Sequence, residues 1–262
     1  MIKLKALHFD KIWGYEEWIA SVHPGGRQEE FYDEVGKDYP LLVKIIESKD
    51  SLSVQVHPDD QLARELEGEK ERGKTECWYV LAAEEGAKLV YGLKGSYTTE
   101  ELRQALEEGR LEDYLNLASV KKGDFIFIPA GTVHAIGGGL RLLEVQQSCD
   151  ITYRLYDWKR GRELHVEKSL QAIKNAPLPP IETFQKSFSC PYFQLNLVDS
   201  IEESGKESKD RLLFVLEASE DGAALSSDSG SYPLHAEDIF FIKAGESPAL
   251  KGKARLMEIK AQ

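Results

Sequence analysis

A repeated pattern of strand-forming segments constrains the fold of this chain more than any other feature of its sequence. The segment YVLAAEEGAKL (79–89) resembles FVLEASEDGAAL (214–225) with one residue of slack, and GDFIFIPAGTVHAI (123–136) resembles EDIFFIKAGESPAL (237–250) without a gap. The first pair is offset by 135 positions and the second by 114, so the first copy holds 21 additional residues between these landmarks. A duplicated unit of this kind predicts two β-barrels, the first carrying an insertion.

Short strands are expected along most of the first copy. Seven segments are rich in β-branched and aromatic residues and are separated by turn signals, the pattern typical of strands. They are LLVKII (41–46), SLSVQV (51–56), CWYVLAA (77–83), AKLVYGL (87–93), DFIFIPA (124–130), LRLLEVQ (140–146) and ITYRLYDW (151–158). The sequence therefore predicts a mainly β fold.

Helical patterns are few. Residues 59–71 and 163–174 are compatible with helices, and residues 98–117 open with Thr98 and Glu101 at the spacing of a capping box. The segment 98–117 is almost as long as the extra stretch in the first copy, so we expect a small helical insertion there. The prolines of residues 175–182 cannot continue a helix, which predicts a linker or covering loop.

Charge and cysteine usage restrict the partners of the chain. The formal net charge of -12 opposes binding to nucleic acid or to an anionic membrane surface. The 42% of apolar residues contain no run as long as a membrane helix, and the first residues lack the pattern of a secretory signal. Three scattered cysteines favour a reducing cytoplasm over a disulfide framework. We expect a cytoplasmic protein, as a monomer or a homodimer.

Four residues of the first copy form a candidate metal site. Gln55 and His57 lie two positions apart, so on a strand both side chains point to one face. Glu76 and His134 lie in two further strand or strand-end contexts. Two imidazoles, one carboxylate and one amide oxygen favour one Zn²⁺ per chain, with Mn²⁺, Co²⁺ and Fe²⁺ as alternatives.

The second copy lacks the same ligands. His134 aligns with Pro248 and Glu76 with Arg211. Any one of the four residues alone is more often an ordinary surface or core residue, and it is their joint occurrence in one copy that indicates a metal. We therefore expect a metal-binding domain over residues 1–176, with its helical insert near 98–117, and a metal-free domain over residues 177–262.

Four motifs in the same order, QVHPDD, GKTECWY, IPAGTVHAI and TYRLYDW, resemble the type I phosphomannose isomerases in their short bacterial form. The resemblance runs from about Trp13 to about Ile173 and continues more weakly through the second copy. It implies two cupin (jelly-roll) barrels and a bound zinc. It also implies the interconversion of mannose 6-phosphate and fructose 6-phosphate. The residues it assigns are Gln55, His57, Glu76 and His134 to the metal, Arg154, Lys74 and Glu144 to catalysis, and Lys44 to the sugar phosphate. Separately from the resemblance, Trp18 and Trp13 are candidate walls of the sugar pocket, although tryptophans in such positions more often pack in the core.

Such an isomerisation moves a proton between two carbons through an enediol(ate), so it needs a base, an acid and a group that stabilises the oxyanion. The base is open between Lys74, Glu144 and a metal-bound water, and Lys74 would need a lowered pKa. The phosphate could bind Lys44 or residues 159–162. Two other functions fit less of the sequence, an iron-dependent cupin oxygenase and a non-catalytic sugar-phosphate-binding cupin.

Overall fold

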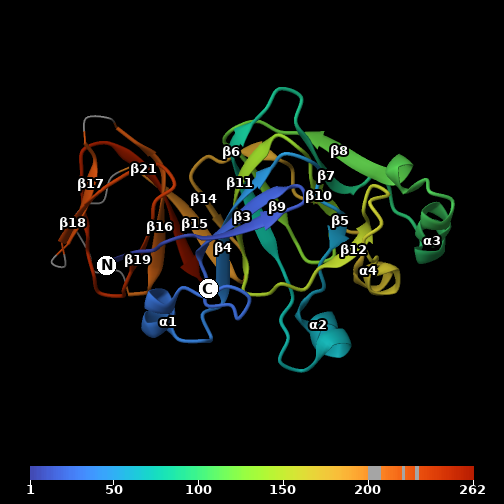
Figure 1. Cartoon of the computed structure of the whole chain (residues 1–262), viewed down its shortest axis with the longest axis horizontal. Coiled ribbons are helices and arrows are strands. Elements are labelled where there is room, and N and C mark those ends of the chain that lie inside the picture. Colours follow the sequence, from blue (N-terminus) through green and yellow to red (C-terminus); the bar gives the residue numbers. More distant parts are fainter. Residues whose placement is uncertain (200–207, 220–221, 228–229) are drawn as a thin grey trace. The chain divides into compact units, whose positions relative to one another are not determined.

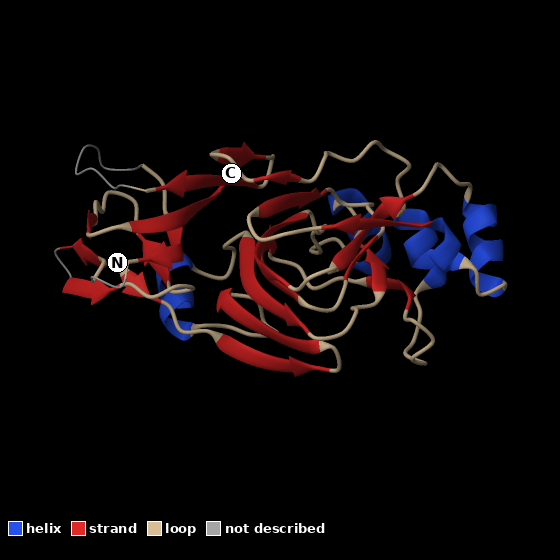
Figure 2. Ribbon diagram, turned by 90° about the horizontal axis from the view of Figure 1, so that it is seen from above, coloured by secondary structure: helices blue, strands red, loops and turns tan. Residues whose placement is uncertain are grey.

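The computed structural model describes residues 1–199, 208–219, 222–227 and 230–262. Strand accounts for 42% of the structure and helix for 14%, which confirms the mainly β prediction (Figure 2). Contacts divide the chain into unit 1, which comprises Met1–Leu7, Trp18–Leu41 and Phe184–Gln262, and unit 2, which comprises His8–Glu17 and Leu42–Thr183. These divisions differ from the boundary at residue 176, and the two predicted domains stay a prediction.

Two antiparallel sheets carry the strands of unit 2 (Figure 1). One has seven strands in the order β13-β9-β6-β11-β4-β3-β2, and the other has five in the order β12-β5-β10-β7-β8. The strands are β2 (Leu7–Lys11), β3 (Gly14–Ala20), β4 (Leu41–Ser48), β5 (Val54–Val56), β6 (Glu76–Ala83), β7 (Lys88–Leu93), β8 (Leu115–Ser119), β9 (Asp124–Ile128), β10 (His134–Ile136), β11 (Leu140–Gln147), β12 (Tyr153–Tyr156) and β13 (Glu182–Thr183). All seven predicted strands are present.

The two sheets of unit 2 share one hydrophobic core. Trp78 of β6 and Ile126 of β9 pack in the same buried cluster as Leu89 of β7 and Ile136 of β10. Burial of these side chains is the main stabilising contribution, because apolar surface removed from water lowers the free energy roughly in proportion to its area. The sheets therefore face each other across this core, and residues at their inner faces can converge.

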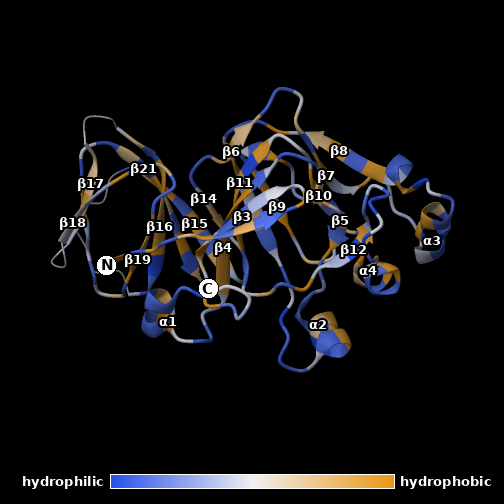
Figure 3. Ribbon diagram, in the orientation of Figure 1, coloured by the Kyte–Doolittle hydropathy of each residue, from blue (hydrophilic) through white to orange (hydrophobic). Residues whose placement is uncertain are grey.

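Helices α2 (Asp60–Glu67), α3 (Thr99–Glu107) and α4 (Val166–Ala172) lie within the three predicted helical segments. The side chain of Thr98 accepts from the backbone of Glu101, and the Glu101 side chain accepts in return, which confirms the capping box. Figure 3 shows hydrophobic and hydrophilic residues on α2, whose Leu62 and Leu66 pack on a buried cluster. Within the part of the chain that is described, no helix has the length and apolarity to cross a membrane.

The helical insertion is shorter than predicted. After α3 the chain passes Gly109 at a φ of 67°, forms a 3₁₀ turn over Leu111–Tyr114, and becomes strand β8. Strand β8 pairs with β7, so sheet hydrogen bonds replace the expected helix over residues 115–117. The segment 175–181 is a covering loop, because Leu178 and Ile181 pack on the core of unit 2.

Unit 1 contains a six-stranded sheet, in the order β1-β19-β16-β21-β15-β14, and a three-stranded sheet, in the order β18-β17-β20. Its elements are β1 (Ile2–Lys3), β14 (Ser187–Ser189), β15 (Phe193–Val198), β16 (Arg211–Ala218), β17 (Ala224–Ser227), β18 (Gly230–Pro233), β19 (Ile239–Ile242), β20 (Ala249–Lys251), β21 (Ala254–Ala261) and the unpredicted helix α1 (Glu29–Val35). Leu213, Phe240 and Leu256 are fully or almost fully buried in its core.

Strand registers support the duplication. Glu76 pairs with Ile128 in unit 2, and Arg211 pairs with Ile242 in unit 1, which reproduces the alignment of the two copies. The β6–β11 pair is irregular between Arg141 and Leu142, and β16–β21 is irregular at the matching position beside Val215. Two units that share both a register and an irregularity have the same strand plan. The closure of each unit into a cupin barrel stays a prediction.

Candidate metal centre

Three predicted ligands come together inside unit 2. His57 follows the last residue of β5, Glu76 is the first residue of β6, and His134 is the first residue of β10. They therefore come from both sheets of the unit. Their ligand atoms all lie within 4.8 Å of one another, and the three residues are at most 1% exposed. The Nε2 atom of His134 is 3.4 Å from Glu76 Oε1, and that of His57 is 3.6 Å from Glu76 Oε2.

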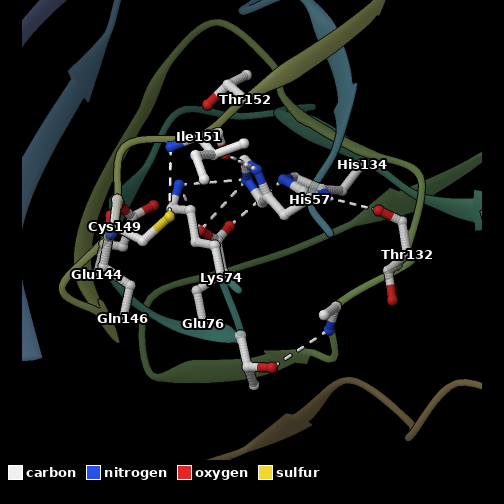
Figure 4. A network of polar contacts seen from close by, with 12 residues as sticks. His57, Lys74, Glu76, Thr132, His134, Glu144, Gln146, Cys149, Ile151 and Thr152 are labelled. Carbon is white, nitrogen blue, oxygen red and sulfur yellow. Dashed lines mark hydrogen bonds and ion pairs between the residues drawn. The ribbon is translucent and has the colours of Figure 1, made fainter. Parts of the chain in front are cut away.

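Each imidazole ring is oriented by the main chain (Figure 4). His57 Nδ1 is 2.9 Å from the carbonyl oxygen of Ile151, and His134 Nδ1 is 2.8 Å from that of Thr132. Because a carbonyl oxygen only accepts hydrogen bonds, each Nδ1 carries the proton and each Nε2 keeps its lone pair, which in His57 faces the Lys74 ammonium at 3.2 Å. A second-nitrogen anchor of this kind is the usual arrangement of a metal-ligating histidine.

Burial keeps both rings in the form that binds metal. It lowers the pKa of His134 to about 4, and together with the nearby Lys74 charge it lowers the pKa of His57 well below its usual value. Both imidazoles are therefore neutral near pH 7. Metal coordination requires this neutral form.

Unsatisfied atoms in the centre fit a cation. Oε1 of Glu76 and Nε2 of His134 are buried without a hydrogen-bond partner among the described residues, while Oε2 of Glu76 is paired with the Lys74 ammonium at 2.8 Å. Buried acceptors of this kind are costly unless they receive a donor or a cation. The two open acceptors lie 3.4 Å apart, so a single metal ion between them would meet this requirement.

Gln55 lies beside this cluster. Its Cα is paired with His134 on one neighbouring strand and with Arg154 on the other. Side chains of directly opposed residues lie on the same face of a sheet, so Gln55 stands between His134 and Arg154. Its assignment as a metal ligand stays a prediction.

Lys74 is in contact with two of the three ligands. Its Nζ atom is 2.8 Å from Glu76 Oε2 and 3.2 Å from His57 Nε2, and the residue is only 5% exposed. Burial lowers the pKa of Lys74, but the charges of Glu76 and Glu144 outweigh it, so the pKa is raised above its usual value. A role for Lys74 as the base would need a lowered pKa, and the protein without metal does not provide it.

Glu144 is held in place by Trp78 and Lys44. Trp78 Nε1 donates to Glu144 Oε2 at 2.9 Å, and Lys44 Nζ lies 3.4 Å from Glu144 Oε1. Lys44 is also 3.7 Å from Glu16 and is buried. Two predicted site residues, Lys44 and Glu144, are therefore connected, and tryptophan fixes the orientation of the carboxylate.

Arg154 and Trp18 stand apart from these contacts. Arg154 donates from Nη1 to the carbonyl of Glu163 at 2.8 Å, and its backbone N–H donates to His165 Nδ1 at 3.1 Å. Trp18 belongs to unit 1, where its ring meets His23 edge-on at 5.8 Å between centroids. Their assigned roles stay predictions.

The basic segment 159–162 has a structural role. Arg160 and Arg162 both donate to the Asp157 carboxylate, which is 3% exposed. Arg160 also donates to the carbonyl of Ser51 at 2.8 Å. These contacts occupy most of the side-chain N–H donors of Arg160, so few of them remain for the phosphate that this turn was expected to bind.

Gln146, which was not predicted as a site residue, is fully buried on β11 and lies directly opposite Glu76. Its spacing of two residues from Glu144 was the available signal, because alternate residues of a strand share a face. The carbonyl anchors of the two histidines were not predicted either. No side-chain pattern reports these, since they depend on the path of the backbone.

Fold and site together define a duplicated β protein in which two histidines and one glutamate of one unit could hold a metal ion. A family model described as phosphomannose isomerase type I, catalytic domain, matches residues 3–82. The mannose-6-phosphate isomerase of Streptococcus mutans is 42% identical over 184 residues, covering 60% of this chain and 57% of that protein. YvyI of Bacillus subtilis, provisionally named a mannose-6-phosphate isomerase, is 31% identical over 268 residues, covering 87% and 83%. The chain belongs to the type I phosphomannose isomerase family.

Solved structures agree with this placement. The crystal structure of the mannose 6-phosphate isomerase from Bacillus subtilis matches with a TM-score of 0.83 and 28% identity, over 98% of each chain. A zinc-bound mannose 6-phosphate isomerase matches with a TM-score of 0.72 and 17% identity, over 94% and 91%, which shows a shared fold. The alignments cover 57%, 53% and 48% of three curated relatives, so the chain spans about half the length of each.

Proposed function

We propose that this chain is a metal-dependent aldose–ketose isomerase that interconverts mannose 6-phosphate and fructose 6-phosphate through an enediol(ate). Membership of the family supports this activity. The observation that carries it is the convergence of His57, Glu76 and His134 within 4.8 Å, with both rings anchored through Nδ1. Such an arrangement suits a bound cation better than core packing.

One Zn²⁺ per chain fits these residues. His57 Nε2, His134 Nε2 and the Glu76 carboxylate would hold it, and three protein ligands with an open position are the usual set of a catalytic zinc site. Mn²⁺, Co²⁺ and Fe²⁺ accept the same mixed donors and are the alternatives. When bound, the ion would supply Lewis-acid polarisation of the sugar oxygens. Gln55 is a candidate fourth ligand.

Lys74 and Glu144 are the candidates for moving protons. Lys74 is a buried ammonium at the ligand atoms, so it is placed to donate to an oxygen that becomes negative during the reaction. Glu144 has one oxygen fixed by the Trp78 indole, while Oε1 lies 3.4 Å from the Lys44 ammonium and accepts no hydrogen bond from a described residue. We assign the proton transfer between the two carbons to this carboxylate, and the donor role to Lys74.

Three further residues would bind the sugar phosphate. Arg154 shares a sheet face with Gln55, and its buried Nε has no hydrogen-bond partner in the described structure, so it retains donor capacity for substrate. Lys44 neutralises Glu144 and supplies positive charge beside the centre. Trp18 is the candidate wall of the sugar pocket.

The same proposal assigns catalysis to unit 2 and a metal-free role to unit 1. Arg211 takes the place of Glu76 there, and a guanidinium cannot bind a cation. The net charge of -12 favours a small-molecule substrate over nucleic acid. The three cysteines are free thiols, which fits the reducing environment of the cytoplasm. Either a monomer or a homodimer is compatible with this activity.

A coupled assay tests the proposal directly. Fructose 6-phosphate formed from mannose 6-phosphate is measured with zinc-loaded protein, then after chelation, and again after zinc is restored. We expect turnover that is lost with the metal and returns with it. Absence of chelator-sensitive turnover in protein that holds one zinc per chain would refute the isomerase assignment.

A further inference from the structure

Gln146 holds a buried acceptor whose direction is fixed. The side chain is fully buried, and its Nε2 donates to the carbonyls of Gln147 at 2.8 Å and Cys149 at 2.6 Å. Because two carbonyls can receive only the amide nitrogen, the amide cannot be turned around. Its Oε1 is therefore directed away from both carbonyls, and among the described residues it has no hydrogen-bond partner.

This acceptor belongs to the face of the metal centre. Gln146 on β11 is directly opposite Glu76 on β6, so the two side chains project from the same face of the sheet. Glu144, two residues earlier on β11, lies on that face too. In Figure 4, Gln146 and Glu144 stand on the same side of Glu76 and Lys74.

The matching position in unit 1 shows that the fold does not require this open acceptor. There the equivalent residue is Lys260, and its Nζ lies 3.1 Å from Glu258, the equivalent of Glu144. Unit 1 thus closes its polar cluster with an ion pair. Unit 2 instead keeps a neutral acceptor without a donor beside the metal ligands, and a buried acceptor of this kind costs free energy until it receives a hydrogen bond.

We propose that Oε1 of Gln146 accepts a hydrogen bond from the 3- or 4-hydroxyl group of the sugar phosphate held at the metal centre. This inference rests on the proposed isomerase function and deepens it, since it names a residue that selects for the substrate's hydroxyl pattern. A buried acceptor discriminates strongly against a ligand that lacks the corresponding hydroxyl, because the acceptor then stays unpaired. Gln146 is a substrate-binding residue in this scheme.

The test compares two neighbouring amides. Gln146→Met removes the acceptor at nearly constant shape, and Gln147→Met is the matched control. Gln147 is buried as well, but its Oε1 accepts from the Thr75 backbone at 2.9 Å and its Nε2 donates to Asp60 at 3.0 Å, so both atoms are satisfied within the protein. Binding of mannose 6-phosphate to zinc-loaded protein is measured by calorimetry, and zinc content is measured alongside.

We expect Gln146→Met to keep one zinc per chain and to bind mannose 6-phosphate about tenfold more weakly, as for the loss of one neutral hydrogen bond. Gln147→Met should lower the melting temperature and leave the sugar affinity within about twofold of the parent. Unchanged affinity in Gln146→Met overturns the proposal. Loss of zinc with unchanged sugar affinity also overturns it, because Oε1 would then serve a water on the metal.

A measurement on the parent protein needs no variant to fold. The 3-deoxy and 4-deoxy analogues of mannose 6-phosphate each lack one hydroxyl, and one of them should bind about tenfold more weakly to the parent. The same analogue should bind equally to the parent and to Gln146→Met. Equal binding of both analogues and mannose 6-phosphate to the parent overturns the assignment alone, whereas absence of turnover in the parent refutes the isomerase function itself.

Discussion

Replacement of Lys74 by methionine should strengthen zinc binding while abolishing turnover. In the protein alone, the Lys74 ammonium is 2.8 Å from a carboxylate oxygen of Glu76, and these residues are 5% and 0% exposed. Removing one partner of a buried ion pair costs about 3–5 kcal/mol, because an uncompensated charge remains in the interior. Lys74→Met should therefore destabilise the metal-free protein by about that amount.

The zinc-loaded variant should lose much less stability, since the ion supplies the positive charge that Glu76 needs. By linkage, the difference between the two forms appears as metal affinity. A difference of about 3 kcal/mol corresponds to roughly a hundredfold tighter zinc binding, at about 1.4 kcal/mol for each factor of ten. The metal-dependent shift in unfolding should increase accordingly.

Urea unfolding with and without chelator gives the two stabilities, and competition with a chromophoric chelator gives the zinc affinity. Lys168→Met is the matched control, because Lys168 is 2.7 Å from Glu67 but its side chain is 42% exposed. Loss of that surface pair should cost about 0–1 kcal/mol with or without metal. Weaker or equal zinc binding by Lys74→Met would refute the idea that its ammonium neutralises Glu76 in the metal-free protein.

Three further outcomes are expected. His134→Ala should lose most bound zinc, measured by metal analysis, together with activity, because it deletes one of three ligand atoms. Arg154→Ala should retain zinc and lose turnover in the coupled assay, and loss of zinc instead would contradict its substrate-binding role. Burial raises the pKa of the Asp157 carboxyl, but hydrogen bonds from Arg162 and Arg160 outweigh it and lower that pKa. The ionised carboxylate therefore stabilises the fold fully above its unfolded pKa of about 4, and this contribution is lost as the pH falls through the lower folded pKa. Asp157→Asn should lower the free energy of unfolding at pH 7 and make it less dependent on acid pH, as followed by circular dichroism.

Much of the fold was predictable because the strand pattern and the duplication are local signals. All seven expected strands form, and the offsets between the copies reappear in the pairing of Glu76 with Ile128 and of Arg211 with Ile242. The expected helix over 98–117 was partly wrong. Leu115 fits both a helical stripe and a strand, and pairing with Leu93 of β7 selected the strand. Tertiary hydrogen bonds decided between two patterns that the local sequence left equivalent.

The candidate site was predictable in its ligands and less so in its electrostatics. Histidine and glutamate at strand ends indicate a metal because few other roles need them there together. The raised pKa of Lys74 depends on Glu76 and Glu144, which lie on neighbouring strands of one sheet. The open acceptor of Gln146 depends on the carbonyls of Gln147, the last residue of β11, and of Cys149, just after that strand. Contacts of this kind follow from the path of the chain, so no residue type or spacing reports them.

The carbonyl anchors of His57 and His134 have a consequence for how the sequence around the site can change. Many metal proteins orient their histidines with a carboxylate side chain, and one substitution removes such a support. Here the supports are the main-chain oxygens of Ile151 and Thr132, which every residue type supplies. Positions 132 and 151 can therefore accept other side chains while the rings keep their direction. Substitutions at these two positions should therefore leave the orientation of the two histidine rings unchanged, and only changes that move the backbone itself would disturb it.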